Sequence, residues 1–178
     1  VLFLNKIDKA NAGVRDTLKL LQTASKTPML LRQIPIWQNG IATGFIDLAL
    51  ERAFVYREHA PSEMVPLAGD DAAREIEARY SMLERLADHD DELMEQLLSD
   101  IAPPKDEVFD DLAADLREGL VMPVFIGAAE RGNGVTRLLK AIRHEGPDAA
   151  VTAKRLGIGS GTVAQVMKTI HTSHAGKL

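Results

Sequence analysis

The sequence predicts an α/β fold, in which a doubly wound, mostly parallel sheet is interrupted by an inserted α+β segment. Two runs, 1–4 and 120–126, are continuously apolar, and each is followed by a polar loop and then by an amphipathic helical pattern. Such runs are typical of parallel strands that are covered on both faces. Between them, a hairpin pattern and three helical patterns interrupt the alternation of strand and helix, which indicates the insertion.

Composition sets the first limits on function. The 178 residues are 46% apolar and 26% charged, which is enough apolar material for a folded core. The absence of cysteine excludes disulfides, thiolate zinc sites and cysteine nucleophiles. Aromatic residues make up 4%, which argues against a base-stacking surface, and the net charge of −5 argues against general polyanion binding. No apolar run reaches the length of a membrane span, so no membrane partner is expected.

The first part of the chain reads as alternating strands and helices. Its predicted elements are, in order, a strand at 1–4, a loop at 5–9, a helix at 13–26, a strand at 29–37, and a hairpin formed by 42–48 and 51–56. Pro35 makes the strand at 29–37 an edge strand or an interrupted one, because proline cannot donate to a ladder. The helix is predicted to carry on its inner side Val14, Leu18, Leu20 and Leu21.

The remainder of the chain is mostly helical up to its last strand and helix. Its predicted elements are, in order, a linker marked by Pro61 and Pro66, helices at 70–88, 90–98 and 106–118, a strand at 120–126, a loop at 127–134 and a helix at 135–144. Asp70 and Asp71 are expected to cap the first of these helices. The inner faces of the first and last helices are predicted to consist of Ile76, Tyr80, Leu83 and Leu86, and of Leu138, Leu139 and Ile142.

Charge is unevenly distributed along the chain. Residues 70–118 contain 17 Asp and Glu against five Lys and Arg, a local charge of −12, while the rest of the chain carries +7. This asymmetry indicates either two faces with different partners or a solvated helical surface.

The loop after the first strand carries the chemistry. In a doubly wound sheet, ligands bind at the carboxyl ends of the strands, so the loops at 5–9 and 127–134 are the expected sites. Asp8 can accept two parallel hydrogen bonds from the N1–H and the exocyclic amine of guanine, a donor pair that adenine lacks. Lys6 can lay its aliphatic stem over the base, and Asn5 can hold the loop or touch the purine. Neither a catalytic group nor a set of metal ligands is evident.

The run Asn5-Lys6-Ile7-Asp8 resembles the guanine-specificity motif NKxD of GTP-binding proteins. Its neighbourhood is most similar to elongation factor G and its paralogues, among the translational GTPases. The further runs that resemble this family are, in order, 35–37 with 44–48 (PIG…GxIDL), 93–98 (LMxKYL), and 122–129 with 134–139 (PVxxGSAxxxxGVxxLLDAV). The resemblance implies a partial P-loop GTPase fold and a guanine nucleotide, GTP or GDP, as ligand.

The family's second guanine loop corresponds to Gly127, Ala128 and Ala129. On this resemblance, the backbone N–H groups of these residues are expected to donate to the guanine O6. Ala128 stands where the family usually has serine, so the hydroxyl that steadies the loop is absent, and weaker base binding is expected.

The resemblance also divides the chain. Residues 1–37 and 119–146 correspond to the back half of the GTP-binding domain, 38–118 to an inserted subdomain, and 147–178 to a linker and the first strand of a following β-barrel domain, at 162–169. The chain opens inside a strand without an initiator Met, and is expected to be a piece of a longer protein. It has no GxxxxGK[ST] or DxxG motif, and the family places both upstream. Mg²⁺ is therefore expected only in the full-length protein, and the piece alone is expected to hydrolyse nothing.

The resemblance implies a cytoplasmic protein that hydrolyses GTP on the ribosome to drive translocation or a related step. Its inserted subdomain is then expected to face the ribosomal stalk protein. One alternative is a ribosome-associated regulatory paralogue with weak GTPase activity. Another is a DNA-binding regulator, because 153–163 has the A-x3-G-x5-V spacing of a helix-turn-helix. In either case the strand at 1–4 is expected to expose one edge, where the piece pairs with another strand edge or a docked segment.

Overall fold

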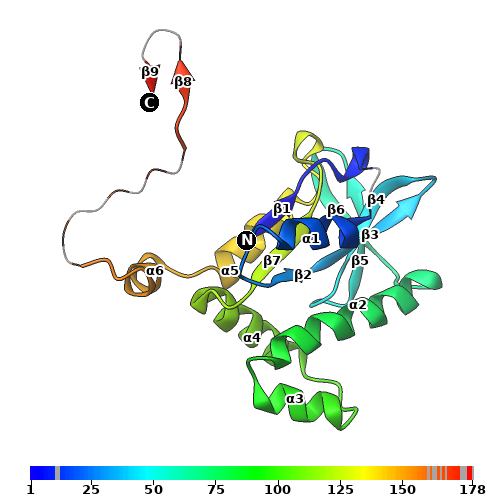
Figure 1. Cartoon of the computed structure of the whole chain (residues 1–178). Coiled ribbons are helices and arrows are strands. Elements are labelled where there is room, and N and C mark those ends of the chain that lie inside the picture. Colours follow the sequence, from blue (N-terminus) through cyan, green and yellow to red (C-terminus); the bar gives the residue numbers. More distant parts are fainter. Residues whose placement is uncertain are drawn as a thin grey trace. The chain divides into compact units, whose positions relative to one another are not determined.

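The computed structural model describes residues 1–10, 13–159, 161, 164, 166, 168–172 and 176–177. They form two compact units, 1–147 and 148–178, and the boundary predicted at Gly146-Pro147 lies within one residue of this division. The elements of the first unit are β1 (Leu2–Leu4), the 3₁₀ helix η1 (Ile7–Lys9), α1 (Val14–Gln22), β2 (Met29–Leu31), β3 (Gln33–Gln38), β4 (Ile41–Asp47), β5 (Arg52–Arg57), β6 (Ala60–Val65), α2 (Asp70–Ala87), α3 (Asp91–Leu98), α4 (Lys105–Glu118), β7 (Met122–Ile126), the 3₁₀ helix η2 (Ala129–Arg131) and α5 (Val135–Glu145) (Figure 1).

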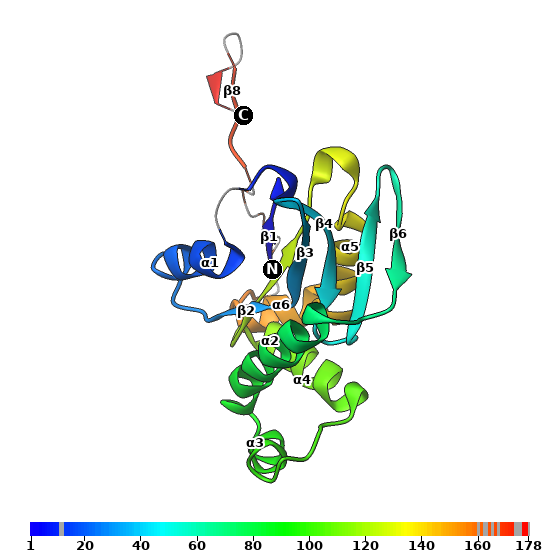
Figure 2. The ribbon, with the colours of Figure 1, turned by 90° about the vertical axis from the view of Figure 1, so that its right-hand side faces the viewer.

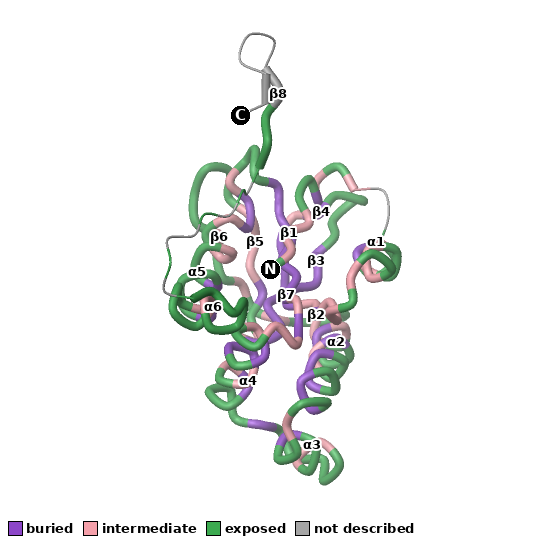
Figure 3. The backbone as a smooth tube through the Cα atoms, turned by 60° about the vertical axis from the view of Figure 1, so that its left-hand side comes forward, coloured by how far each residue is buried: buried purple, intermediate pink, exposed green. Residues whose placement is uncertain are grey.

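A parallel sheet of three strands, in the order β1-β7-β2, lies at the centre of the first unit. Phe3 pairs with Phe125, and Leu30 with Pro123. Helices α1 and α5 lie on opposite sides of this sheet (Figures 2 and 3), which is the doubly wound arrangement. The prediction that both apolar runs belong to a parallel sheet is confirmed. The strand at 1–4 is only half-buried, however, because among the described residues β1 is an edge strand with β7 as its one neighbour.

A second, antiparallel sheet has the strand order β3-β4-β5-β6 (Figure 2). The predicted hairpin is confirmed as β4 and β5, with Phe45 opposite Phe54. The prediction of an edge or interrupted strand around Pro35 is also confirmed, because the run splits at Arg32 into β2 and β3, and β3 is an edge strand. The domain boundary expected between residues 37 and 38 falls inside β3, which pairs with β4 along its whole length.

The prediction of a linker around Pro61 and Pro66 is wrong for residues 60–65. They form β6, which pairs with β5 at the outer side of the antiparallel sheet. A proline without an N–H is tolerated in such an outer strand. Most side chains of β6 are exposed, so its sequence lacks the apolar alternation that identifies a half-buried strand.

Helices α2, α3 and α4 confirm the three helices predicted between residues 70 and 118. Helix α3 begins after Asp90, whose Oδ1 accepts hydrogen bonds from the N–H groups of Glu92 (2.8 Å) and Leu93 (2.9 Å). Helix α4 ends at Gly119, which takes the left-handed conformation with φ of 79°. The prediction that Asp70 and Asp71 cap α2 is wrong, because the residue at that position is Gly69.

The predicted inner faces of the helices are only partly correct. In α2, Leu83 and Leu86 are buried, but Ile76 is 68% and Tyr80 50% exposed. The apolar residues that the period of the helix assigned to an inner face and that the structure leaves exposed are Leu20, Ile76, Tyr80, Leu139 and Ile142. The period identifies an apolar stripe within one helix, whereas its neighbours in space decide how much of the stripe is covered.

Helix α1 ends at Gln22, four residues before its predicted end at 26. The Gln22 carboxamide closes the turn that follows, because its Oε1 accepts a hydrogen bond from Met29 N (2.7 Å) and its Nε2 donates to Thr27 O (3.1 Å). Side-chain bonds of this kind compete with helix continuation and favour a turn.

A set of buried and partly buried polar residues, which we call the polar seam, joins the two sheets. Its members are Arg32, Gln33, Asp47, Arg137 and Glu145. Arg32 N donates to Val124 O (3.0 Å), and Gln33 Oε1 accepts from Ile126 N (3.0 Å), so β3 is held beside the end of β7. The fully buried Arg32 guanidinium lies near the rings of Phe109 and Phe125, and its Nη1 donates to Glu145 Oε2 at 2.5 Å.

Two apolar cores fill the first unit. The larger lies among β2–β5 and α2–α4, and includes Ile46, Leu48, Met82, Leu86 and Leu112. Figure 3 shows buried residues along both α2 and α4. The smaller core lies under the loop at 5–9, and its buried members are Ile7, Val14, Ala42, Phe45 and Ile126. The antiparallel sheet therefore supports the loop that carries the NKxD run.

The second unit contains α6 (Ala149–Arg155), β8 (His171–Thr172) and β9 (Gly176–Lys177), and the two strands pair antiparallel. Helix α6 begins after Asp148, whose carboxylate accepts from Val151 N (2.7 Å). Of the strand expected at 162–169, positions 164, 166, 168 and 169 are described and belong to no strand or helix. The other four positions lie outside the described residues, as do 160, 162 and 163 of the alternative helix-turn-helix.

In the part of the chain that the structure describes, none of the helices combines the length and the apolar character that crossing a bilayer requires.

A recess lined by Asp90 and Asp111, between the start of α3 and α4, gives a pH-dependent prediction. Burial, followed by the charge and hydrogen bond of Asp90, raises the pKa of Asp111 from 3.8 to about 6. The folded state therefore holds this proton more tightly than the unfolded state, and the contribution to stability falls as pH rises from about 4 to 6. Asp111→Asn is expected to raise the free energy of unfolding by about 1 kcal/mol above pH 7, after a discount for solvent screening, and by nothing below pH 4.

Urea denaturation followed by circular dichroism across this pH range checks the Asp111 prediction. The neighbouring exposed Asp110→Asn is the matched control, because it removes one negative charge from the same helix. It is expected to change stability by less than about 0.5 kcal/mol. A stability gain from Asp111→Asn that is equal at pH 4 and pH 8 would show that the carboxyl charge is not its cause.

Candidate functional site

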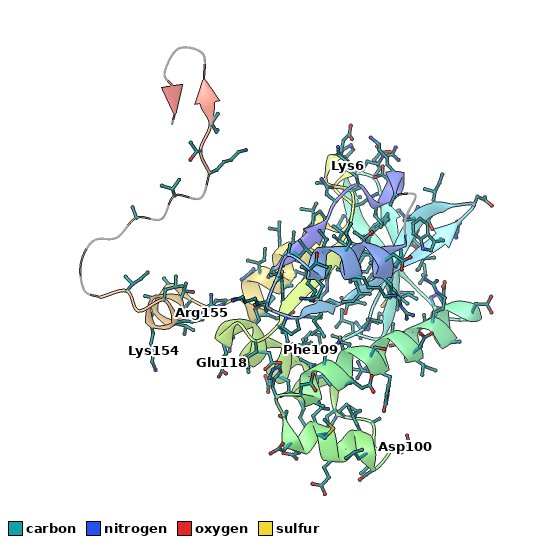
Figure 4. All side chains as sticks on the ribbon, in the orientation of Figure 1. Lys6, Asp100, Phe109, Glu118, Lys154 and Arg155 are labelled. Atoms are coloured by element: carbon teal, nitrogen blue, oxygen red, sulfur yellow. The ribbon has the colours of Figure 1, made fainter. Side chains whose placement is uncertain are left out.

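The two predicted loops meet at the carboxyl ends of β1 and β7, which are neighbouring parallel strands. Gly127 N donates to Leu4 O (3.1 Å), and Ile7 N donates to Gly127 O (3.0 Å), so the backbones of the two loops are bonded to each other. Figure 4 labels Lys6 at this end of the sheet, beside the loop that follows β7. The structure thus brings together all six residues that the sequence singled out: Asn5, Lys6, Asp8, Gly127, Ala128 and Ala129.

The side chain of Asn5 links the two loops. Its Oδ1 accepts hydrogen bonds from Lys6 N and from Ala129 N, each at 2.9 Å. Lys6 takes the left-handed conformation with φ of 61° and presents an exposed side chain. Because Lys6 immediately precedes η1, this turn sets the direction in which Asp8 leaves the loop.

The carboxylate of Asp8 lies at the rim of the site, with its side chain 11% exposed. Its Oδ2 is 3.6 Å from Nε of Arg131, which belongs to η2 in the second loop. The carboxylate is thus paired with the loop that follows β7. Sequence reasoning missed Arg131. The signal available was its position in the loop predicted to face Asp8.

The second loop is built around a short backbone bridge. Ala128 N donates to Asn133 O (3.0 Å), and Asn133 N donates to Ala128 O (3.1 Å). Gly134 closes the loop with φ of 76°, and a Cβ there would lie 2.4 Å from Ile126 O. Gly127 has no room for a Cβ either, since it would meet Asn133 O at 2.2 Å and the ring of Phe3 at 2.7 Å. The two backbone hydrogen bonds between Ala128 and Asn133 therefore hold this loop in place, although Ala128 lacks the hydroxyl of the family's serine.

The expected backbone donors for a purine O6 are all engaged within the chain. The N–H of Gly127 bonds Leu4 O, that of Ala128 bonds Asn133 O, and that of Ala129 bonds Asn5 Oδ1. The first two bonds hold the backbone together, so they are structural. The bond to Asn5 is exposed and involves a side chain, so only Ala129 N–H is free to exchange its acceptor for a base.

Ala128 gives a prediction about the missing hydroxyl. Its side chain is buried directly opposite Asn133, and among the described residues Asn133 Oδ1 is a buried oxygen without a hydrogen-bond partner. Since directly opposed residues share a face, the hydroxyl of Ala128→Ser can donate to that oxygen. The variant is expected to gain about 0.5–1.5 kcal/mol in the free energy of unfolding, measured by urea denaturation. Ala129→Ser, with an exposed side chain, is the control, and a loss of stability in Ala128→Ser contradicts the expected bond.

The hairpin of β5 and β6 also reaches the site, which sequence reasoning did not predict. His59 N, at its turn, donates to Arg131 O (2.9 Å), and the Tyr56 hydroxyl donates to Ile126 O (3.5 Å). Burial and, second, the negative charge of Asp8 raise the pKa of the Tyr56 hydroxyl, which keeps it a neutral donor. No local pattern indicates these contacts, because about 70 residues separate the hairpin from the loop that it touches.

Among known proteins, the chain is similar to several that are named elongation factor G or elongation factor G-like. No family model matches the chain. It is 39% identical over 176 residues to an elongation factor G-like protein of Synechocystis sp. (strain ATCC 27184 / PCC 6803 / Kazusa), covering 97% of this chain and 26% of that protein. It is 31% identical to elongation factor G of Dehalococcoides mccartyi (strain ATCC BAA-2266 / KCTC 15142 / 195) and 32% identical to elongation factor G 1 of Geobacter sulfurreducens, each over 80% of this chain and 21% of the relative.

Among solved structures, a crystal structure of a Thermus thermophilus protein matches 88% of this chain and 23% of its own chain, with a TM-score of 0.71 and 24% identity. This likeness supports the fold alone. The chain spans about a quarter of the length of the curated relatives that it matches.

Proposed function

This chain belongs to the elongation factor G family, of which it matches one segment, and we propose that it supplies the guanine-recognition loops of a GTPase that acts on the ribosome. The observation that carries the proposal is the bond of Asn5 Oδ1 to Ala129 N, at 2.9 Å. It links the two loops at the ends of β1 and β7 and sets the Asp8 carboxylate beside them. This is the place where doubly wound folds bind their ligands.

The proposed chemistry is recognition of the guanine edge. Asp8 accepts hydrogen bonds from N1–H and the 2-amino group, Lys6 covers the base with its stem, and Asn5 braces the loops. Gly127 and Ala128 shape the second loop through their backbone bonds, and Ala129 N–H, which is bonded to Asn5 Oδ1 in the free chain, exchanges that bond for one to O6 when the base binds. Adenine lacks this donor pair and forms neither hydrogen bond with the carboxylate, which makes the site selective.

The phosphates and Mg²⁺ are proposed to be held by other parts of the full-length protein. The 178-residue sequence contains no GxxxxGK[ST] and no DxxG, the runs that hold phosphate and Mg²⁺ in P-loop GTPases. Catalysis of phosphoryl transfer depends on positioning and charge around those phosphates. We therefore expect the chain alone to bind guanine nucleotides weakly and to hydrolyse none.

A titration of the chain with nucleotide tests the proposal. GDP and ADP are added separately to the isotope-labelled protein, and amide chemical shifts are followed by NMR at millimolar ligand concentrations. GDP is expected to shift the amides of 5–9 and 127–134, and ADP to leave them unchanged. Equal shifts with both nucleotides, or shifts confined to other parts of the chain, would reject guanine recognition at this site.

The partners of the full-length protein are proposed to be the ribosome and, for the inserted part, its stalk protein, in the cytoplasm. Residues 70–118, with a local charge of −12, form α2, α3 and α4 and give that part a surface able to attract a basic partner. The half-buried β1 edge is proposed to pair with a further strand of the same protein or of another chain.

One observation favours a second candidate, a ribosome-associated regulatory paralogue with weak GTPase activity. Identity is 39% to an elongation factor G-like protein and 31–32% to proteins named elongation factor G, and Ala128 departs from the serine of the family. Turnover of GTP by the full-length protein with and without ribosomes distinguishes the two candidates. Strong stimulation by ribosomes supports the elongation factor, and weak turnover in both conditions supports the regulatory paralogue.

A further inference from the structure

Arg131 holds a position that the proposed base recognition does not account for. Its Nε lies 3.6 Å from Oδ2 of Asp8, the carboxylate that is proposed to read guanine. The side chain of Arg131 is 52% exposed, whereas that of Asp8 is 11% exposed. A cation from the second loop therefore covers the carboxylate from the solvent side.

The guanidinium of Arg131 can take the place of the base because both present N–H donors to the carboxylate. Arginine presents a planar fork of N–H donors to a carboxylate, and the N1–H and 2-amino group of guanine form a similar planar donor pair. At 3.6 Å the contact with Asp8 is an ion pair and not a hydrogen bond. Such a partly exposed pair is weak, so an incoming base can displace it.

The main chain of Arg131 is held independently of its side chain. Arg131 N donates to Ala128 O (3.1 Å), and Arg131 O accepts from His59 N (2.9 Å) at the turn between β5 and β6. A change of the side chain therefore leaves the turn intact. The backbone that carries the guanidinium is, however, bonded to His59 N. The chemical shift of the His59 N–H therefore serves as a reporter of guanidinium movement.

We propose that Arg131 is a specificity-determining residue that competes with guanine for the Asp8 carboxylate, so that base binding requires its displacement. The inference rests on the proposed guanine-binding function. Arg131 lowers the affinity for guanine nucleotides and leaves that for adenine nucleotides unaffected, since only guanine uses both carboxylate oxygens.

The test compares the GDP:ADP affinity ratio of the wild-type chain with those of three variants, by NMR titration. Using the ratio cancels general attraction of the phosphates to positive charge. Arg131→Gln removes the charge and keeps the length of the side chain, and the ratio is expected to rise about two- to fivefold. Arg131→Lys restores the charge and is expected to return the ratio toward the wild-type value. Arg57→Gln, which removes an exposed cation paired with Glu63, is the matched control and is expected to leave the ratio unchanged.

The outcomes separate this inference from the proposed function. A wild-type ratio of one rejects guanine recognition, and the inference with it. A wild-type preference for GDP together with an unchanged or lower ratio in Arg131→Gln overturns the competition alone. A rise in the ratio for both Arg131→Gln and Arg57→Gln assigns the effect to overall charge and also overturns it. In the supporting outcome, GDP additionally shifts the His59 amide of the wild type more than that of Arg131→Gln.

Discussion

Glu145→Gln is expected to lower the free energy of unfolding by about 3–5 kcal/mol, the largest effect of any single substitution considered. The Arg32 guanidinium is fully buried, and Glu145 is its ion-pair partner at 2.5 Å. The substitution leaves a buried cation without a compensating charge, and the desolvation cost of that cation is then unopposed. Urea denaturation followed by circular dichroism, or by fluorescence of the single Trp37, measures the loss.

Two further variants separate the buried pair from ion pairs in general. Arg15→Gln breaks an exposed pair with Glu77, with side chains 57% and 66% exposed, and is expected to cost less than about 1 kcal/mol. The double replacement Arg32→Met with Glu145→Leu removes both charges, and is expected to recover most of the lost stability. A cost of Glu145→Gln no greater than that of Arg15→Gln would contradict the role given to the polar seam.

The polar seam also matters for the site. Gln33, next to Arg32 in the chain, accepts a hydrogen bond from Ile126 N, and Ile126 is the last residue before the loop at 127–134. On the other side of the seam, Asp47 at the end of β4 pairs with Arg137 of α5 at 2.5 Å. The seam thus fixes the antiparallel sheet against the strand and helix that flank the second loop. Its disruption is therefore expected to weaken nucleotide binding together with stability.

The second large effect concerns Asp8→Asn, which is expected to change the base that the site prefers. The amide replaces one carboxylate acceptor with an N–H donor. The 2-amino group of guanine, which is a donor, then meets the N–H donor of the amide. Xanthine carries an oxygen at that position, and this oxygen can accept a hydrogen bond from the amide. Since a bidentate base contact is worth about 1–3 kcal/mol, GDP affinity is expected to fall about 5- to 150-fold, with a gain for xanthosine diphosphate.

A matched control removes one negative charge elsewhere. Asp16→Asn neutralises an exposed carboxylate of α1 that pairs only loosely with Lys19, at 3.8 Å. It is expected to leave both nucleotide affinities at the wild-type level. Comparable losses of GDP binding in the two variants would assign the effect to net charge.

The parts of the fold that the sequence predicts well are those whose signals are local. The apolar runs of β1 and β7 and the three helices between residues 70 and 118 each depend on a pattern within a short stretch of sequence, and the structure has all of them. β6 was not predictable in this way, because its exposed side chains carry no pattern and its pairing with β5 supplies the strand. Which apolar residues of α1 and α5 stay exposed depends on which neighbouring elements cover each helix. The helical period of the sequence does not contain that information.

The same distinction applies to the site. The chemical types at Asn5 and Asp8 point to a guanine edge from the sequence alone, since the motif is contiguous. The Asn5–Ala129 bond joins residues 124 positions apart, and the contacts of Arg131 and His59 depend on two turns meeting in space. Those contacts determine which N–H groups are hydrogen-bonded and which side chain covers Asp8, and no pattern within the sequence contains them.

The most direct measurement is the pair of diphosphate affinities, for guanosine and xanthosine, of the wild-type chain and of Asp8→Asn under one set of conditions. We expect a crossover, with the wild type preferring guanosine diphosphate and the variant preferring xanthosine diphosphate, while both keep the same fold by circular dichroism. A variant that loses both nucleotides equally, or retains the guanosine preference, would show that the Asp8 carboxylate does not read the base.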